Sequence, residues 1–334
     1  MIRKLSISVD FVRATLANTV AAGLDPNQLL IHNRISPRLL LEHDARISME
    51  RFADLQSHTM RAMQDESLGY HSRTLPLGTW EMMCHATIGS GRVLDALQRF
   101  CRYYRLFGFD LSLDLKTDSR LVSLTLSHGD EPLSSDSGYL AHTILFNCHR
   151  YLSWLGNAFV PIHSVALVEP ARFSQSDYHR MFLGAPVSFG DGSRVKLNRK
   201  ALMVDIEQTP LSLRHYLRHP TLIMLTHSHA SSGWSGRVYE LLRRNLTEPP
   251  ELANVAKSLD IHPQTLRRRL DAEGTSFSEL KSFMRRDYAL HLLGKRGLSI
   301  EEIAYRTGFS ESSAFIRAFK TWTGATPYTY RKGL

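Results

Sequence analysis

The sequence has only three cysteines, Cys84, Cys101 and Cys148. Their wide spacing and odd number argue against a disulfide framework and fit a reducing cytoplasm. The Cys84-His85 and Cys148-His149 pairs and the His227-x-His229 motif do not have the spacing of a closed four-ligand zinc site. We therefore expect no bound metal.

Long apolar runs are also missing. No segment approaches the ~18 apolar residues that a membrane-spanning helix needs. The N-terminus is basic at Arg3 and Lys4, but polar and charged residues interrupt its apolar positions, unlike the core of a signal peptide. We expect a soluble intracellular protein that does not cross a membrane.

The sequence contains no convincing nucleotide-binding loop. Gly89 and Gly91 form a Gly-x-Gly pair, but no strand is predicted before them and no third glycine follows, so we interpret the pair as a turn. We assign no catalytic residue and no cofactor, and we predict that the protein is not an enzyme.

Positive charge is unevenly distributed along the chain. The 334 residues carry a formal net charge of +9. From Ser235 to Leu334 there are 17 Lys and Arg against 11 Asp and Glu, a net +6, whereas the preceding 234 residues hold 24 against 21, a net +3. A basic excess at one end favours a polyanionic partner for that end.

The length and patterning predict two domains. Thr226–Gly236 (THSHASSGWSG) is rich in Ser, Gly and His and has no periodicity, as is typical of a linker. We predict one domain at 1–225, a linker at 226–236 and a second domain at 237–334.

The N-terminal domain alternates helical and strand patterns. Alternation with period two predicts a β-hairpin from 109–116 and 121–128. Helices are predicted at 46–63, 93–107, 139–155 and 174–182, and further strands at 164–168, 186–189 and 195–197. This order indicates a mixed α/β fold with a partly antiparallel sheet. The aromatic residues Tyr103, Tyr104, Phe107, Phe146, Tyr151 and Trp154 fit either a core or an effector pocket.

The C-terminal domain contains two similar helix pairs, which predicts an all-α fold. In the first, a helix at 251–259 is followed by a turn at Asp260-Ile261, with His262 as a cap and Pro263 at the first position of the next helix, 264–270. Leu266 and Leu270 of that second helix point inward. The residues on its other side are Gln264, Thr265, Arg267 and Arg268, an arrangement typical of a recognition helix.

The second pair repeats this pattern about 48 residues later. A helix at 299–307 begins with a Ser299-x-x-Glu302 capping box, Gly308 supplies the turn, and Ser310 caps the next helix at 311–321. Phe315 and Phe319 point inward in that helix. The outward positions are Ser312, Ser313, Ile316 and Arg317.

One helix, 277–293, joins the two pairs. At 1.5 Å per residue it spans about 25 Å, so both second helices can enter successive major grooves about 34 Å apart on one face of DNA. We interpret the pairs as two helix-turn-helix units. For the arginines, base reading and phosphate contact both remain open, and short serine side chains favour backbone contact. Arg285 and Arg286 of the joining helix are expected to pair with nearby acids.

The patterns LANVAKSLDIHPQTLRRRL, GTSFSEL and LSIEEIAYRTGFSESSAFIRAFKTWTGATPYTYR together resemble the AraC/XylS family of transcription regulators over residues 235–331. In that family the second helix of each unit reads bases. The resemblance therefore implies DNA contact by Gln264, Thr265, Arg267, Arg268, Ser312, Ser313 and Arg317. The DNA sequence that they read does not carry over.

The N-terminal region more loosely resembles the sensor domain of the ornithine-utilisation-regulator-like branch of the family, known as an arabinose-binding domain. The matching segments are AGLDP near Gly23, DARIS near Arg46, RFCRYYRLF, and FLGAPVSF near Gly184. The resemblance implies an activator that binds double-stranded promoter DNA, recruits RNA polymerase, senses a small-molecule effector and forms a homodimer. No ligand-binding residue can be named.

Two alternatives remain open. A DNA alkylation-repair protein with regulatory helix-turn-helix units needs a cluster of zinc-bound thiolates, and three scattered cysteines do not supply one. Alternatively, the N-terminal domain of a regulator senses a protein partner in place of a small molecule, and the sequence does not separate these two.

Overall fold

The computed structural model describes residues 6–42, 45–107, 111–127, 135–168, 173–190, 192–226, 234–245, 249–272, 276–293, 297–323 and 326–332. Its contacts group the chain into two compact units. Unit 1 takes in segments 1–13, 27–55 and 230–334, and unit 2 takes in 14–26 and 56–229. The domain limits expected from the sequence stay a prediction.

Unit 2 is built on a five-stranded mixed sheet in the order β3-β4-β7-β5-β6. Its strands are β3 (Ser112–Thr117), β4 (Leu121–Ser127), β5 (Ile162–Val168), β6 (Val187–Gly190) and β7 (Ser193–Asn198). All neighbours pair antiparallel except β5 and β6, which are parallel. This confirms the predicted hairpin and the partly antiparallel α/β fold; residues 109, 110 and 128 of that hairpin lie outside the described residues.

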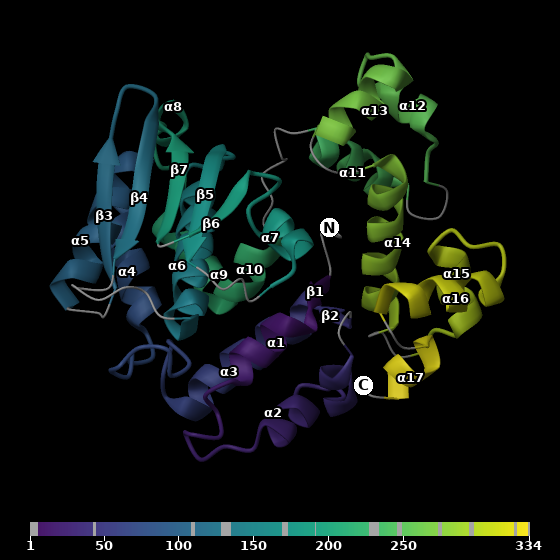
Figure 1. Ribbon diagram of the computed structural model, residues 1–334, viewed down its shortest axis with the longest axis horizontal. Coiled ribbons are helices and arrows are strands. Elements are labelled where there is room, and N and C mark those ends of the chain that lie inside the picture. Colours follow the sequence, from purple (N-terminus) through teal and green to yellow (C-terminus); the bar gives the residue numbers. More distant parts are fainter. Residues whose placement is uncertain are drawn as a thin grey trace. The chain divides into compact units, whose positions relative to one another are not determined.

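Alternation along the strands gives the sheet one buried and one polar face. In β4, Val122, Leu124 and Leu126 are buried, whereas Ser123 and Thr125 between them face the other way. Helix α5 (Val93–Phe107) contacts β3, and α6 (Ser135–Leu155) contacts β5 and β7. Figure 1 shows the strands side by side with α5 and α6 against them.

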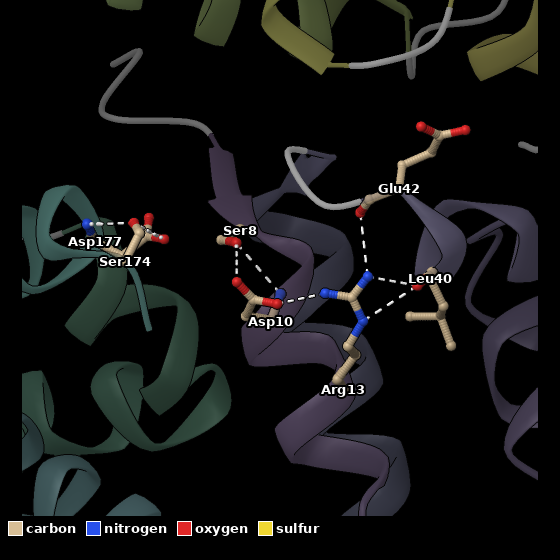
Figure 2. Close-up of polar contacts among 7 residues, drawn as sticks. All are labelled: Ser8, Asp10, Arg13, Leu40, Glu42, Ser174 and Asp177. Atoms are coloured by element: carbon tan, nitrogen blue, oxygen red, sulfur yellow. Dashed lines mark hydrogen bonds and ion pairs between the residues drawn. The ribbon is translucent and has the colours of Figure 1, made fainter. Parts of the chain in front are cut away.

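Smaller helices complete unit 2. They are α4 (Thr79–Ile88), α7 (Gln175–Met181), α8 (Arg199–Leu202), α9 (Pro210–Arg218) and α10 (Pro220–Thr226). Among them only α7 was predicted from the sequence. Its N-cap is Ser174, whose hydroxyl accepts a hydrogen bond from the Asp177 amide (Figure 2). The others are short and their periodicity is too brief to read from sequence.

Two of the aromatic residues in question belong to the core. Tyr151 is 1% exposed and Trp154 is 6% exposed, and their rings stack at 5.8 Å. The Tyr151 hydroxyl lies 2.8 Å from the Thr87 hydroxyl, which satisfies a polar group that burial would otherwise leave without a partner. Phe107, in contrast, is 59% exposed. Neither the buried pair, Tyr151 and Trp154, nor the exposed Phe107 ring supports an enclosed aromatic pocket.

The N-terminal segment contains a short antiparallel strand pair that the sequence did not reveal. β1 (Ser6–Ser8) pairs with β2 (Arg46–Ser48), and Ile7 lies opposite Ile47. The helix predicted from Arg46 is therefore wrong at its start, because α3 (Met49–Met63) begins only after β2. Strands of three residues carry too little alternation to compete with the adjoining helical pattern.

Arg13 fixes the fold of this segment (Figure 2). It lies in α1 (Val9–Leu16) and pairs with Asp10. Its guanidinium also donates to the Leu40 carbonyl (Nε, 3.2 Å) and to the Glu42 carbonyl (Nη2, 3.1 Å). These carbonyls lie at the end of the 3-10 turn η1 (Pro37–Leu41), which follows α2 (Pro26–His32), so Arg13 satisfies acceptors that the turn leaves open.

Among the described residues, no helix is long and apolar enough to cross a membrane.

Candidate nucleic-acid interface

Within the described residues from 234 onward, seven helices follow one another in unit 1. They are α11 (Trp234–Arg244), α12 (Leu252–Ser258), α13 (Pro263–Ala272), α14 (Phe277–Leu293), α15 (Ile300–Arg306), α16 (Ser312–Thr323) and α17 (Pro327–Lys332). Figure 1 shows α11, α12 and α13 at one end of α14 and α15, α16 and α17 at the other. The joining helix has the bounds that the sequence predicted. Residues 227–233 of the predicted linker lie outside the described residues, and α11 already begins at Trp234.

The first helix pair is held by an apolar core. Leu266 and Leu270 on α13 are completely buried, and they pack with Val255 and Ala256 of α12. Val238 and Leu242 of α11 close the same cluster. Because Ala256 has only a methyl group, α12 and α13 can approach closely.

The second pair has an aromatic core. Phe315 and Phe319 of α16 are completely buried, with ring centroids 5.6 Å apart. Phe309 contacts Phe315 edge-on, and Tyr330 of α17 contacts Phe319 edge-on. The predicted inward positions of both recognition helices are therefore confirmed.

The two turns between the helices use the same backbone conformation. Asp260 has φ 55° and Gly308 has φ 79°, both in the left-handed region. In each turn the next residue donates its amide to a carbonyl five residues back, Ile261 to Ala256 at 3.1 Å and Phe309 to Ala304 at 3.0 Å. This hydrogen bond ends the first helix and directs the chain into the second. The positive φ predicted for Gly308 is confirmed.

We predict opposite effects of a Cβ atom at these two positions. Gly308→Ala adds a Cβ atom to a residue in the left-handed conformation and should lower the free energy of unfolding by about 1–2 kcal/mol. Asp260→Gly removes a Cβ atom from such a residue and should change the free energy of unfolding by less than about 0.5 kcal/mol or raise it. Urea unfolding followed by circular dichroism measures both. Equal losses in the two variants would contradict a shared turn geometry.

Polar caps fix where two of the helices begin. The Gln264 amide donates to Nδ1 of His262 at 3.3 Å, which confirms the predicted cap of α13. Ser299 and Glu302 form a complete capping box on α15. The cap predicted at Ser310 is wrong by one residue, because α16 begins at Ser312 and the carbonyl of Glu311 accepts the Phe315 amide.

The predicted DNA-contacting residues of α13 lie on its solvent face. Gln264, Arg267 and Arg268 are exposed and Thr265 is half-buried. Neither the Arg267 nor the Arg268 guanidinium forms a hydrogen bond or ion pair with another residue that the structure describes. The neighbouring Arg269 is different, because its guanidinium carbon lies 3.9 Å from the Trp234 ring centroid. Two arginines of the run are thus available to a ligand and the third is held by α11.

The outward residues of α16 form a second, smaller face. Arg317 and Ser313 are exposed, and Ser312 is half-buried. The Ser313 hydroxyl donates to the Glu311 carboxylate at 3.1 Å. Arg317 points away from Phe315 and Phe319, because it lies two residues from each, and residues two apart on a helix do not share a face. The sequence prediction of which side faces solvent therefore agrees with the burial of both recognition helices.

Arg285 links the joining helix to the second turn. It donates to the Gly308 carbonyl at 2.8 Å and its guanidinium lies 4.9 Å from the Phe309 ring centroid. Burial lowers the pKa of Arg285, and the Glu251 carboxylate offsets part of that effect. Arg285 therefore interacts with the nearby acid Glu251 through its charge, while Lys281 donates the hydrogen bond to that carboxylate at 2.8 Å. Arg286 is buried.

The three cysteines lie in the core of unit 2. All three are buried and unpaired, and burial raises the pKa of each thiol. No group of three or more His, Cys, Asp or Glu side chains that could hold a metal occurs within the described residues. His227 and His229 lie outside them. Neutral thiols do not favour the methyl-accepting thiolate that the alkylation-repair alternative requires.

Two models of known protein families match this chain. Residues 23–204 match the family described as "Arabinose-binding domain of AraC transcription regulator, N-term", and residues 255–333 match a helix-turn-helix domain family. The first match alone spans more than half of the chain. The chain belongs to the AraC family of transcription regulators.

The curated relatives are bacterial regulators. The ornithine utilization regulator of Pseudomonas aeruginosa is 23% identical over 336 residues, which are 98% of this chain and 96% of that protein. The regulator VirS of Mycobacterium tuberculosis is 43% identical over 98 residues, 29% of each chain. The solved structure of the transcriptional regulator CdpR from P. aeruginosa aligns at 23% identity and a TM-score of 0.34, covering 92% of this chain and 96% of that one.

Family membership confirms the resemblance stated from the sequence. This AraC-family chain is a DNA-binding transcription regulator with an N-terminal domain of the arabinose-binding type. Sequence reasoning missed Trp234, which lies in the predicted linker and holds Arg269 and Arg237 by cation–π contacts. A lone tryptophan next to Gly and Ser residues gave no periodic signal that could have revealed it.

Proposed function

We propose that this regulator is an activator that binds promoter DNA with both helix-turn-helix units at once. The observation that supports it is the pair of exposed faces on α13 and α16, carried on opposite ends of α14. We assign DNA contact to Gln264, Thr265, Arg267 and Arg268 in the first unit and to Ser312, Ser313 and Arg317 in the second.

The length of α14 supports simultaneous binding. Its 17 residues span about 25 Å along the helix axis, and the flanking helices add further width. Successive major grooves on one face of DNA lie about 34 Å apart. A single protomer can therefore present two recognition helices to neighbouring grooves, which predicts an asymmetric binding site.

Effector sensing, dimerisation and recruitment of RNA polymerase complete the proposed function. We propose that the segment before the linker at 226–236 senses a small-molecule effector and forms a homodimer, and that the DNA-binding domain at 237–334 recruits RNA polymerase. The arabinose-binding-type domain supports effector sensing by its family, without naming the effector. A protein partner in place of the small molecule remains the second reading of this domain.

The salt dependence of binding separates phosphate contacts from base contacts. The full chain and its Arg268→Ala variant are measured by fluorescence anisotropy on a DNA site selected from a random pool. The wild-type Kd should weaken steeply between about 50 and 200 mM salt, because neutralised phosphates release counterions. If Arg268 holds a phosphate, the variant should reduce the slope of log K against log salt by about 1 and keep its sequence preference.

If Arg268 reads a base, the Arg268→Ala variant should keep the wild-type slope of log K against log salt. Its sequence preference should then relax at one base position of the DNA site. The matched control is Arg214→Ala, an exposed arginine of α9 in unit 2, which should change neither quantity. A wild-type affinity that does not depend on salt would contradict the proposed function as a whole.

A further inference from the structure

A large hollow lies against the sheet of unit 2. Its volume is about 970 Å³, and it is lined by α5 and by strands β3, β4 and β7. Metabolite-binding pockets have volumes of roughly 300–1,000 Å³, so the space suits a small molecule. The lining is polar and charged, in contrast to the mostly apolar pockets that hold uncharged ligands.

Strand register places two lysines on either side of a serine. Lys116 of β3 lies opposite Ser123 of β4, and Ser123 lies opposite Lys196 of β7. Neighbouring strands are about 4.8 Å apart, so the two lysine Cα atoms are separated by about 10 Å. The two ammonium groups and the serine hydroxyl therefore share one row on the polar face of the sheet.

The next row along the strands continues the site. Asp114, Thr125 and Arg194 lie opposite one another in the same three strands. The Arg194 side chain donates from Nε to the Thr125 hydroxyl at 3.1 Å, which orients the guanidinium and leaves its terminal nitrogens for a ligand. Arg102 and Arg105 of α5 line the same hollow from the helix side.

The charges of the hollow are not balanced by the protein. Five cationic side chains line it, with Asp114 as the one carboxylate in the lining. None of the five forms an ion pair with a residue in the part of the chain that the structure describes. Cys101 also lines the hollow, and burial raises the pKa of its thiol to about 12, so it adds no negative charge.

We propose that this hollow binds a small organic anion with at least two carboxylate or phosphate groups. Lys116 and Lys196 hold one anionic group beside Ser123, and Arg194 in the next row holds another. The excess positive charge of the lining disfavours a cation such as ornithine, which appears in the name of one relative. A neutral sugar would not neutralise this charge. That this anion is the effector rests on the proposed function, whereas its binding does not.

The test is isothermal titration calorimetry on the full chain without DNA, in phosphate-free buffer at about 50 mM salt to limit screening. The probes are citrate and pyrophosphate, with arabinose and ornithine for comparison. We expect at least one anion to bind with a Kd below about 1 mM, and both comparison compounds to bind at least tenfold more weakly. Tighter binding of citrate would indicate recognition of carboxylate groups, and tighter binding of pyrophosphate would indicate recognition of phosphate groups.

Variants assign the binding to this hollow. Lys196→Ala and Arg194→Ala should each raise the Kd of the more tightly bound anion at least fivefold. Lys196→Arg should keep that Kd within about threefold of the wild type, because it keeps the charge. Arg214→Ala, outside the hollow, should bind like the wild type. Absence of anion binding to the wild type, equal binding by all variants, or tighter binding of ornithine or arabinose would overturn the proposal.

DNA binding is measured separately on the same variants. Lys196→Ala and Arg194→Ala should keep the wild-type DNA affinity in the absence of the anion. A loss of DNA affinity in these variants would mean that the surface binds the DNA backbone, and it would also overturn the anion site. If the wild-type chain binds the anion but does not bind DNA, that result would contradict the proposed function and leave the anion site supported by calorimetry.

Discussion

Replacing Phe315 by alanine should destabilise the second helix-turn-helix unit by about 3–5 kcal/mol, the usual cost of removing a fully buried phenylalanine ring. Phe315 is completely buried and contacts both Phe309 and Phe319, each at 5.6 Å between ring centroids. Loss of the ring removes these contacts and leaves a cavity between α15 and α16. Because Phe309 also packs on Trp322 at 5.8 Å, the defect should spread through the unit.

Urea unfolding of the full chain measures this effect. Phe315→Leu keeps an apolar side chain at the site and should lose less than Phe315→Ala. The matched control is Tyr305→Ala, because Tyr305 belongs to the same unit but is 72% exposed, and this change should stay within about 0.5 kcal/mol. A similar small loss in both aromatic variants would show that the second unit is not organised around Phe315.

The second large effect is expected on DNA affinity. Arg267→Ala and Arg317→Ala should each weaken binding to the selected DNA site by about 1–3 kcal/mol, which is roughly 5- to 150-fold in Kd. Each arginine is exposed on the outward side of its recognition helix, and its guanidinium forms no hydrogen bond or ion pair within the described residues. An arginine in this position can donate two hydrogen bonds to guanine in the major groove.

Arg269→Ala is the control for the first of these variants. It changes the same residue type on the same helix, but Arg269 stacks on Trp234, so affinity for the selected site should stay within about twofold. Binding is measured by anisotropy at fixed salt, since affinities at different salt concentrations are not comparable. If Arg269→Ala weakened binding more than Arg267→Ala, the assignment of the reading face would be wrong.

The C-terminal domain could be predicted closely because its signals are local. Pro263, the Ser299 capping box and Gly308 each act within a few residues, and apolar positions repeat at helical spacing. These signals gave the bounds of α14 and the inward residues of α13 and α16. The Ser310 cap failed because two adjacent polar residues, Ser310 and Glu311, can both precede a helix, and local pattern does not choose between them.

The N-terminal part could be predicted only in outline. The hairpin of β3 and β4 is local, and its alternating pattern revealed it. The pairing of β1 with β2 joins residues 40 positions apart, as does the contact of Trp322 with Ser282 in the other part of the chain. The hollow against the sheet depends on register across three strands, two of which lie about 70 residues apart. Such pairings follow from tertiary packing and leave no pattern in a single sequence.

Methylation interference on the selected DNA site tests the central claim most directly, because the N7 atom of guanine lies in the major groove. The wild-type chain should show two clusters of interfering guanines on one face of the duplex, about 10 base pairs apart. Arg267→Ala should remove one cluster and Arg317→Ala the other. A single cluster that responds to both substitutions, or two clusters that respond to neither, would contradict simultaneous binding by the two units.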